Sequence, residues 1–210
     1  KNSKKRTRYI DDFKTKWEAL NYGEPFFDVA LSISRSPPST FVCLVIDFLE
    51  QAGRWGHIKA IKRLDQMPFL DENLRSKWIV QGAKLGESIF FPLAADCLWE
   101  GFEGQAPDKS RALGLYLQAA ELNHARATYN AGLLLSDGFE GQPPDKPKAL
   151  KLYLQSAKLN SAEAMCDAGL LLSVGFEGQA PDKRKALELY LQAAELNSVG
   201  GMCNAGTLLA

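Results

Sequence analysis

Two kinds of helical pattern alternate through the second half of the chain. In residues 146–159, KPKALKLYLQSAKL, apolar side chains recur with a period near 3.6 and form one broad stripe, while lysine and glutamine occupy the remaining face. In residues 124–136, HARATYNAGLLLS, alanine and glycine lie beside leucine, a spacing that suits a helix packed closely against a neighbour. Neither segment alternates with the period of two that indicates a strand, and β-branched residues are scarce in both. The pattern predicts an all-α structure built from pairs of helices.

The pair of helices repeats every 37 residues. Three full units cover 87–123, 124–160 and 161–197, and a partial unit follows at 198–210. The second and third units are identical at 26 of 37 positions, so chance similarity does not explain the repeat. Repeated units of this length bury their apolar faces by stacking on their neighbours. Residues 87–210 are therefore predicted to form one array of stacked helix hairpins.

An eight-residue loop with two glycines joins the helices of each unit, at 101–108, 138–145 and 175–182. Such a loop could bind a phosphate group or could serve only as a turn. Its last residue is an aspartate, which can cap the second helix and would take the place of a phosphate at the helix N-terminus. The loop also carries a glutamate that would repel phosphate, and it lacks the Lys-Ser/Thr ending of nucleotide-binding loops. We interpret it as a turn with glycines at positive φ and with its phenylalanine tucked beneath.

The repeated unit resembles the Sel1-like repeat, a relative of the tetratricopeptide repeat. The resemblance is carried by A-x-A-x-Y-N-A-G-L-L, by the glycine loop and by the following D-K-x-K-A-L-x-L-Y. The loop is one residue longer than the usual G-x-G-V-x-x-D of that family, and the longer form recurs in all three units. The resemblance implies an α-α superhelix, a right-handed solenoid of stacked antiparallel helix hairpins, that presents an adaptor surface inside larger assemblies.

The same resemblance implies that the first helix of each hairpin lines a concave, protein-binding face. Three columns assigned to this face differ between the second and third units, namely 126/163, 129/166 and 130/167, whereas the neighbouring AGLLLS is constant, as expected where packing does not dictate the residue. The residues assigned in this way to protein binding are Arg126, Tyr129, Asn130, Leu133, Glu163, Cys166, Asp167 and Leu170. The alternative is that they are surface positions that tolerate many residues.

The first 86 residues do not repeat cleanly. We expect a helical extension with a basic tail at 1–49 and a degenerate helical repeat or cap at 50–86, which lacks the glycine loop. Residues 40–67 are also faintly similar to one hairpin of the pentatricopeptide family, whose members usually act on organellar RNA. Val42 and Cys43 stand at the start of that hairpin, and only one unit is visible, so reading of RNA bases is not expected.

Charge is unevenly distributed along the chain, although the formal net charge is zero. Residues 1–86 hold 15 Lys/Arg against 10 Asp/Glu, and residues 87–210 hold 10 against 15. The basic residues of the opening segment are Lys1, Lys4, Lys5, Arg6 and Arg8. This segment is either a solvated tail or a contact to RNA phosphates, and a phosphate contact would weaken steeply as the salt concentration rises.

Side chains suited to catalysis or metal binding are few. His57 and His124 lie in different units, and no Cys/His spacing indicates a zinc site. The four cysteines form no close pairs, which suits a reducing compartment. Cys166 and Cys203 occupy equivalent positions on neighbouring repeats, too far apart for a disulfide, so we expect free thiols. We predict no metal, no cofactor and no catalytic residue, with a hydrolase as the enzymatic alternative.

The leading hypothesis is a non-catalytic scaffold or adaptor that binds other proteins within a larger complex. The alternative is an accessory subunit of an organellar ribonucleoprotein assembly, such as a mitochondrial ribosome, that contacts RNA through its basic N-terminus. The longest apolar run, FVCLVI at 41–46, is far shorter than the roughly 20 residues of a membrane helix, so no membrane span is predicted. We expect an intracellular protein, in the cytosol or inside an organelle such as the mitochondrion.

The last 13 residues, 198–210, supply only the first helix of a fourth hairpin. Leu208 and Leu209 therefore lack the second helix that would cover them. We expect that the natural protein continues or that a partner covers this apolar end.

Overall fold

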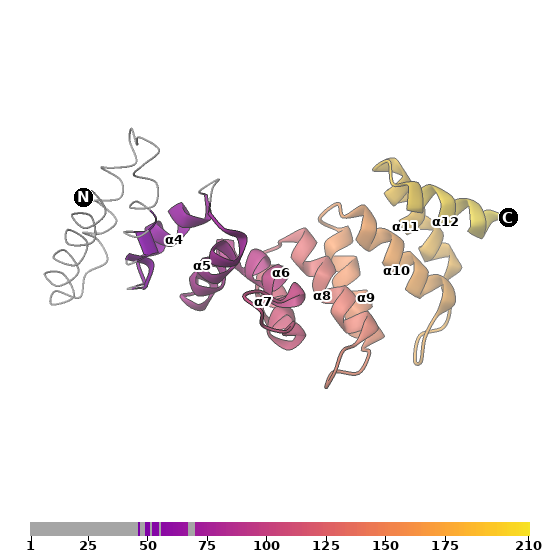
Figure 1. The fold of residues 1–210 in the computed structure, drawn as a ribbon. Helices are drawn as coiled ribbons and strands as arrows, with labels where there is room; N and C mark the ends of the chain where they lie inside the picture. The colour runs from indigo at the N-terminus through magenta and orange to yellow at the C-terminus, as the bar shows by residue number, and fades with distance from the viewer. Residues whose placement is uncertain (1–45, 47–48, 51, 55, 67–69) are drawn as a thin grey trace, which may run out of the picture. The chain divides into compact units, whose positions relative to one another are not determined.

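The computed structural model describes residues 46, 49–50, 52–54, 56–66 and 70–210 (Figure 1). The chain divides into two compact units, Lys1–Phe90 and Phe91–Ala210. The first unit contains α4 (Ile58–Asp65), α5 (Glu72–Lys84) and the short 3-10 helix η2 (Ser88–Phe90). The second contains α6 (Phe91–Glu100), α7 (Lys109–Glu121), α8 (Ala125–Asp137), α9 (Lys146–Ala157), α10 (Ala162–Val174), α11 (Lys183–Glu195) and α12 (Val199–Leu209). Every named element of the described residues is a helix, which confirms the predicted all-α class.

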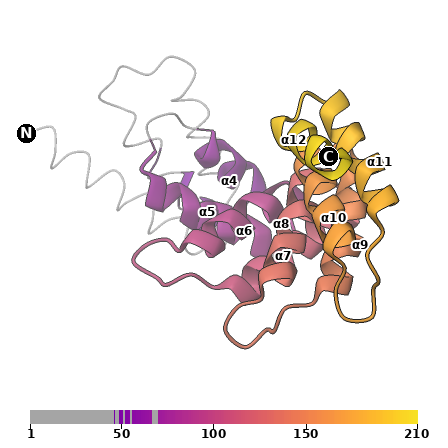
Figure 2. The same ribbon diagram turned by 90° about the vertical axis from the view of Figure 1, so that its right-hand side faces the viewer.

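The second unit is an α-α superhelix of stacked helix hairpins. Helices α6 and α7, α8 and α9, and α10 and α11 form three hairpins, and α12 begins a fourth. Each helix packs on the next along the chain, and α10 also contacts α12, so neighbouring hairpins lie side by side. The long loops after α6, α8 and α10 leave the stack at the same end (Figure 2). The compact unit begins at Phe91, whereas the predicted start of the array at residue 87 stays a prediction.

Each of the last two hairpins is closed by a tyrosine of the second helix that packs on a glycine of the first. A Cβ atom added to Gly132 would lie 2.6 Å from the ring of Tyr153, and one added to Gly169 would lie 2.6 Å from the ring of Tyr190. Because real Cβ atoms do not approach ring carbons so closely, these two rings keep their positions only over glycine. In the second and third units the glycine of AGLLLS is thus a packing requirement, whereas the first unit carries Ala95 at the equivalent position.

The glycine loops are turns, as predicted. In the second loop, Gly138 has φ +71°, and an added Cβ would lie 2.8 Å from the carbonyl oxygen of Gln142. The N–H of Phe139 donates to the carbonyl of Gln142 at 2.8 Å, and the N–H of Gln142 donates back to Phe139 at 2.8 Å. The loop phenylalanine is half-buried, and in the third loop Phe176 packs against the core. The left-handed conformation and the missing space both require glycine at the start of this turn.

The aspartates that end these loops cap the second helices. The side chain of Asp108 accepts from the N–H of Arg111 at 2.9 Å. Asp145 and Asp182 make the equivalent bonds at 3.0 Å each, to the N–H groups three residues further on. These contacts satisfy backbone donors that the helix leaves free in its first turn, and they confirm the predicted caps.

The C-terminal helix α12 is covered on one side. Leu209 is exposed, whereas Leu208 is half-buried and packs against the core. Leu172, the residue of α10 that corresponds to Leu209, is buried. One of the two predicted uncovered leucines therefore has a partial cover in α12.

Candidate functional site

The predicted protein-binding residues lie on two neighbouring first helices. Those on α8 are Arg126, Tyr129, Asn130 and Leu133, and those on α10 are Glu163, Cys166, Asp167 and Leu170. The side chains on α8 reach in two directions, because some contact α6 and α7 of the preceding hairpin and others contact α10 of the following one. The result is a continuous row of side-chain contacts from α6 to α10.

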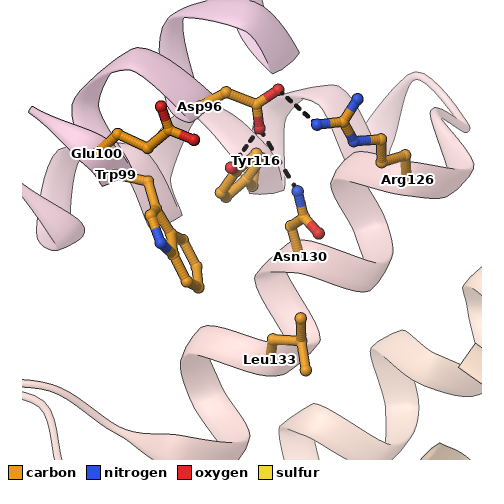
Figure 3. A pocket seen from close by; sticks show the side chains of 7 residues that line it. All are labelled: Asp96, Trp99, Glu100, Tyr116, Arg126, Asn130 and Leu133. Atoms are coloured by element: carbon orange, nitrogen blue, oxygen red, sulfur yellow. Dashed lines mark hydrogen bonds and ion pairs between the residues drawn. The ribbon is translucent and has the colours of Figure 1, made fainter. Parts of the chain in front are cut away.

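A carboxylate on α6 is the centre of the first contact. Asp96 accepts from the Tyr116 hydroxyl at 2.6 Å, from the Arg126 guanidinium at 3.0 Å and from the Asn130 side-chain amide at 3.5 Å (Figure 3). These four residues, here called the Asp96 cluster, come from α6, α7 and α8. Two of the three donors belong to the predicted binding residues, so the prediction found one side of the cluster.

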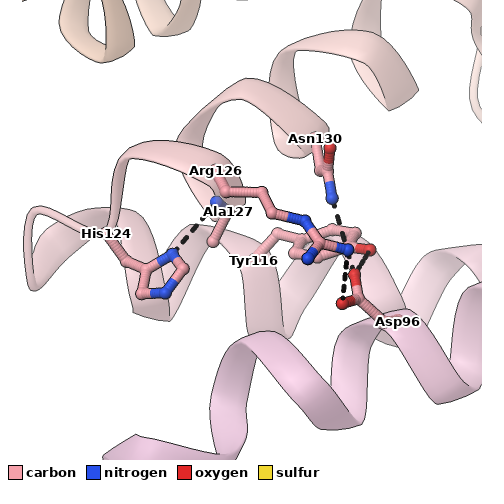
Figure 4. Close-up of polar contacts among 6 residues, drawn as sticks. All are labelled: Asp96, Tyr116, His124, Arg126, Ala127 and Asn130. Atoms are coloured by element: carbon pink, nitrogen blue, oxygen red, sulfur yellow. Dashed lines mark hydrogen bonds and ion pairs between the residues drawn. The ribbon is translucent and has the colours of Figure 1, made fainter. Parts of the chain in front are cut away.

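The start of α8 presents Arg126 and Asn130 to Asp96. The side chain of His124 caps this helix by accepting from the N–H of Ala127 at 3.2 Å, as Figure 4 shows. The first turn then directs Arg126 toward α6, and Asn130, four residues later, lies on the same face of the helix. A cap and a helical spacing thus orient two donors at one acceptor.

Burial and charge change the acidity of the tyrosine in this cluster. The Tyr116 side chain is 2% exposed. Burial raises the pKa of its hydroxyl, and the hydrogen bond to Asp96 and the charge of that carboxylate raise it further. Tyr116 therefore stays a proton donor to Asp96 at physiological pH.

A small cavity opens beside the Asp96 cluster. It has a volume of about 150 Å³, and Trp99 and Glu100 of α6 and Leu133 of α8 complete its wall. Trp99 borders the opening on one side, and Arg126 and Asn130 border it on the other (Figure 3). The Trp99 ring packs edge-on against Tyr116 at a centroid distance of 6.2 Å, and the Lys109 ammonium lies 5.9 Å from its centroid.

A second contact joins α8 to α10. Here the donor comes before the acceptor along the chain, whereas in the Asp96 cluster the acceptor comes first. The Tyr129 hydroxyl donates to Asp167 at 3.0 Å, and the Tyr129 ring lies 5.7 Å from that of Tyr153. Burial raises the pKa of the Asp167 carboxyl and the charges of Asp137 and Glu163 act in the same direction, whereas the bond from Tyr129 lowers it.

The remaining predicted residues differ in exposure. Leu133 is half-buried against the core, whereas Leu170 is 53% exposed. The Cys166 sulfur lies 3.7 Å from the Ser198 hydroxyl, and burial raises the pKa of its thiol. The Glu163 carboxylate accepts from the Ser161 hydroxyl at 3.1 Å.

The basic residues proposed to contact RNA lie outside the described residues. They are Lys1, Lys4, Lys5, Arg6 and Arg8. The N-terminal extension 1–49 falls almost wholly in the same part of the chain. The RNA contact stays a prediction.

The other histidine of the described chain also has a structural role. His57 caps α4 by accepting from the N–H of Ala60 at 3.3 Å, as His124 caps α8. Cys97, Cys166 and Cys203 form no disulfide in the described part of the chain. Within the described residues, no group of three or more His, Cys, Asp or Glu side chains could hold a metal ion. In the same residues no helix is long and apolar enough to span a membrane.

The comparison of the second and third units missed part of the site. Asp96, Trp99 and Glu100 belong to the first unit, where they stand at positions that carry Leu133, Ser136 and Asp137 in the second. An aspartate in a column that carries leucine in the second and third units was the signal that could have revealed the cluster.

Comparison with known proteins identifies the repeat. The sequence model of the Sel1 repeat matches three successive segments, 93–124, 125–161 and 162–198. The second and third matched segments begin one residue after the start of a predicted unit and contain the hairpins α8–α9 and α10–α11, whereas the first begins at residue 93, inside α6. No curated protein sequence matches the chain.

Solved structures of Sel1 repeat proteins share the fold. A protective antigen of uropathogenic Escherichia coli strains, described as displaying an SLR fold, aligns with a TM-score of 0.68 at 22% identity. That alignment covers 78% of this chain, which spans 36% of the length of the antigen. A Sel1 repeat protein from Oxalobacter formigenes aligns with a TM-score of 0.62 at 22% identity, over 99% of this chain and 86% of the other.

Proposed function

Because the chain belongs to the Sel1 repeat family, we propose that it is a non-catalytic scaffold that binds another protein through its first helices. Proteins built from these repeats are typically scaffolds for protein–protein interaction. Stacked repeats offer an extended surface in which each unit adds a few side chains without changing the packing beneath. The partner would contact α6, α8 and α10, the helices joined by the row of polar contacts described above.

One observation carries this proposal: the polar side chains of the row are held by hydrogen bonds or ion pairs and still reach the surface. The Arg126 side chain is 73% exposed although it is paired with Asp96. Tyr129 and Asp167 are half-buried and hydrogen-bonded to each other. Side chains that are already held in place lose less conformational entropy when a partner binds, so they contribute more of their interaction energy to affinity.

An exposed apolar side chain lies on the same helices. Leu170 of α10 is 53% exposed and stands four residues after Cys166, on the same face. Protein interfaces commonly combine a buried apolar contact with a surrounding polar rim. Leu170 is therefore the apolar centre that we assign to the binding surface.

The surface can be tested with two leucines that are matched in exposure. Leu191 on the second helix α11 is 47% exposed, against 53% for Leu170. A photoreactive residue would replace each in turn, and adducts formed in an extract of the native source would be identified by mass spectrometry. We expect one protein to be captured in quantity from position 170 and little of it from position 191.

Two results would contradict the proposal. Equal capture of the same partner from both positions would mean that the first helices are not the binding face. Turnover of phosphate, ester or peptide substrates by the purified chain, abolished by a single substitution, would mean that the protein is an enzyme.

A second candidate function is contact with RNA as part of an organellar ribonucleoprotein. It is favoured only by the basic opening segment, KNSKKRTR. We consider the case in which its five basic residues contact phosphates of single-stranded RNA. A plot of the logarithm of the binding constant against the logarithm of the salt concentration would then have a slope of about −3 to −4. RNA binding that persists in high salt would count against this function. RNA binding that persists after residues 1–8 are deleted would count against it as well.

A further inference from the structure

The cavity beside the Asp96 cluster accepts one type of side chain from the partner. We propose that this cavity, between α6, α7 and α8, receives the positively charged end of a lysine or arginine side chain. The inference rests on the proposed function, because it assigns the chemistry of one point on the proposed binding surface. It also predicts that the partner presents a basic segment.

Groups that attract a cation surround the opening. Among the described residues, the exposed carboxylate of Glu100 has no hydrogen bond or ion pair, so it is available to a ligand. The Trp99 ring lines the cavity, and indole is the best of the aromatic rings for contact with a cation. The chain's own Lys109 ammonium already lies 5.9 Å from that ring and does not line the cavity.

Groups that would attract an anion are already engaged. The Arg126 guanidinium is paired with Asp96 at 3.0 Å, and the Tyr116 hydroxyl also donates to that carboxylate. The cavity wall holds two carboxylates, of Asp96 and Glu100, against one guanidinium, so its formal charge is −1. A ligand carboxylate would have to displace Asp96 from Arg126 and would then face Glu100.

The size of the cavity fits one side chain. Sites that enclose a drug-sized molecule have volumes of roughly 300–1,000 Å³, whereas this one has about 150 Å³. An ammonium or guanidinium group on its methylene stem fills a space of this order. The apolar stem can lie on Leu133 and Trp99, because such side chains commonly bury their stems while the charge stays at a polar site.

The arrangement is confined to the first hairpin. In the second hairpin, Leu133 takes the place of Asp96, Ser136 that of Trp99, and Asp137 that of Glu100. The column of Arg126 carries Glu163 one unit later. The second hairpin therefore has an equivalent acid but lacks the aromatic ring, which makes it an internal control.

Small ions can test the cavity without the partner. The full chain would be titrated with ethylguanidinium and butylammonium as cationic probes and with propionate as the anionic one. The measured signal is the indole N–H resonance of Trp99, assigned with the variant Trp99→Phe. We expect a saturable shift with both cations and none with propionate.

Two matched substitutions locate the binding. Glu100→Gln removes the available carboxylate and should weaken cation binding by about threefold to fivefold, the effect of one exposed ion pair. Asp137→Asn changes the equivalent acid of the next repeat and should leave the titration unchanged. Both side chains are exposed, so neither change should impair folding.

The outcomes separate this inference from the proposed function. A cation shift that weakens in Glu100→Gln and persists in Asp137→Asn supports the inference. A shift with propionate instead, a cation shift that Asp137→Asn weakens as much as Glu100→Gln, or no shift with any probe overturns it. None of these results changes the crosslinking test at Leu170 and Leu191, which decides the proposed function independently.

Discussion

A single carboxyl group on α10 illustrates how the environment sets the behaviour of a residue in this repeat. Asp167 is half-buried, and burial raises its pKa above the ordinary value of 3.8, with Asp137 and Glu163 adding to this effect. The hydrogen bond from Tyr129 acts against it. A group that is more basic in the folded state stabilises the fold less as the pH rises through the interval between its two pKa values.

The substitution Asp167→Asn should therefore raise stability at neutral pH. An asparagine oxygen can still accept from Tyr129, and asparagine occupies the equivalent positions 130 and 204. We expect the free energy of unfolding to rise by an amount on the order of 0.5 kcal/mol at pH 7, because the variant removes a half-buried negative charge. Urea unfolding at several pH values should show the gain shrinking as the pH falls from the raised pKa of folded Asp167 toward 3.8, and no gain below 3.8.

The opposite result has a clear meaning. A loss of stability at pH 7 in Asp167→Asn would show that the charged acceptor strengthens the bond from Tyr129 by more than burial costs. Tyr129→Phe is the companion measurement, since it removes the donor and keeps the ring beside Tyr153.

The helix hairpin is the element in which packing is most demanding. The glycine of AGLLLS lies under the tyrosine ring of the second helix, at Gly132 with Tyr153 and at Gly169 with Tyr190. A Cβ added to the equivalent Gly206 of α12 would meet no neighbouring atom within 4 Å, because α12 carries no such ring above it. One column of the repeat thus holds the same residue in two different environments.

Alanine at the two kinds of glycine should have opposite effects. Gly169→Ala forces a Cβ against the Tyr190 ring and should destabilise the fold by about 1–3 kcal/mol, the usual cost of overpacking. Gly206→Ala removes an exposed helical glycine without a clash and should stabilise by about 0.5–1 kcal/mol. Thermal unfolding of both variants is the measurement, and a loss of stability in Gly206→Ala would contradict the packing argument.

The caps can be tested at the same scale. Asp182→Ala removes the acceptor for the N–H of Lys185, 3.0 Å away, and should cost about 1 kcal/mol. Asp182→Asn keeps an oxygen in place and should cost much less. Glu177→Ala in the same loop is the control, and a comparable loss there would mean that the loop rather than the cap was measured.

In the array Phe91–Ala210 as a whole, a change in stability should stay close to the hairpin in which it is made. Each helix of Phe91–Ala210 packs chiefly on its immediate neighbours, so a change in one hairpin is passed on only through the next interface. Structures of this kind open in segments, because distant repeats share few contacts.

Hydrogen exchange of Gly169→Ala should reveal this locality. Amide exchange should accelerate most in α10 and α11, less in α9 and α12, and least in α6 and α7. The measurement is mass spectrometry of exchanged peptides from the variant and the native chain. Equal acceleration in all helices would show that the unit unfolds as one cooperative block.

The sequence allowed the helices, turns and caps to be predicted because each feature occurs three times in the same register. The glycines, aspartates and tyrosines of the repeat recur where the backbone or the packing demands them. The centre of the site was not predictable in this way, because Asp96 and Trp99 stand where the first unit departs from the shared pattern. Arg126 and Asn130 were identified, but the acceptor that explains them lies 30 and 34 residues earlier.

The two polar contacts also mean that the units cannot exchange places. In a chain with 161–197 placed before 124–160, the residues opposite Asp96 would be the glutamate and the aspartate of the transplanted unit, in place of Arg126 and Asn130. Three carboxylates would then share one location, with the Tyr116 hydroxyl as the remaining donor. A few charged side chains thus distinguish near-identical units, and they favour one order of the units along the chain.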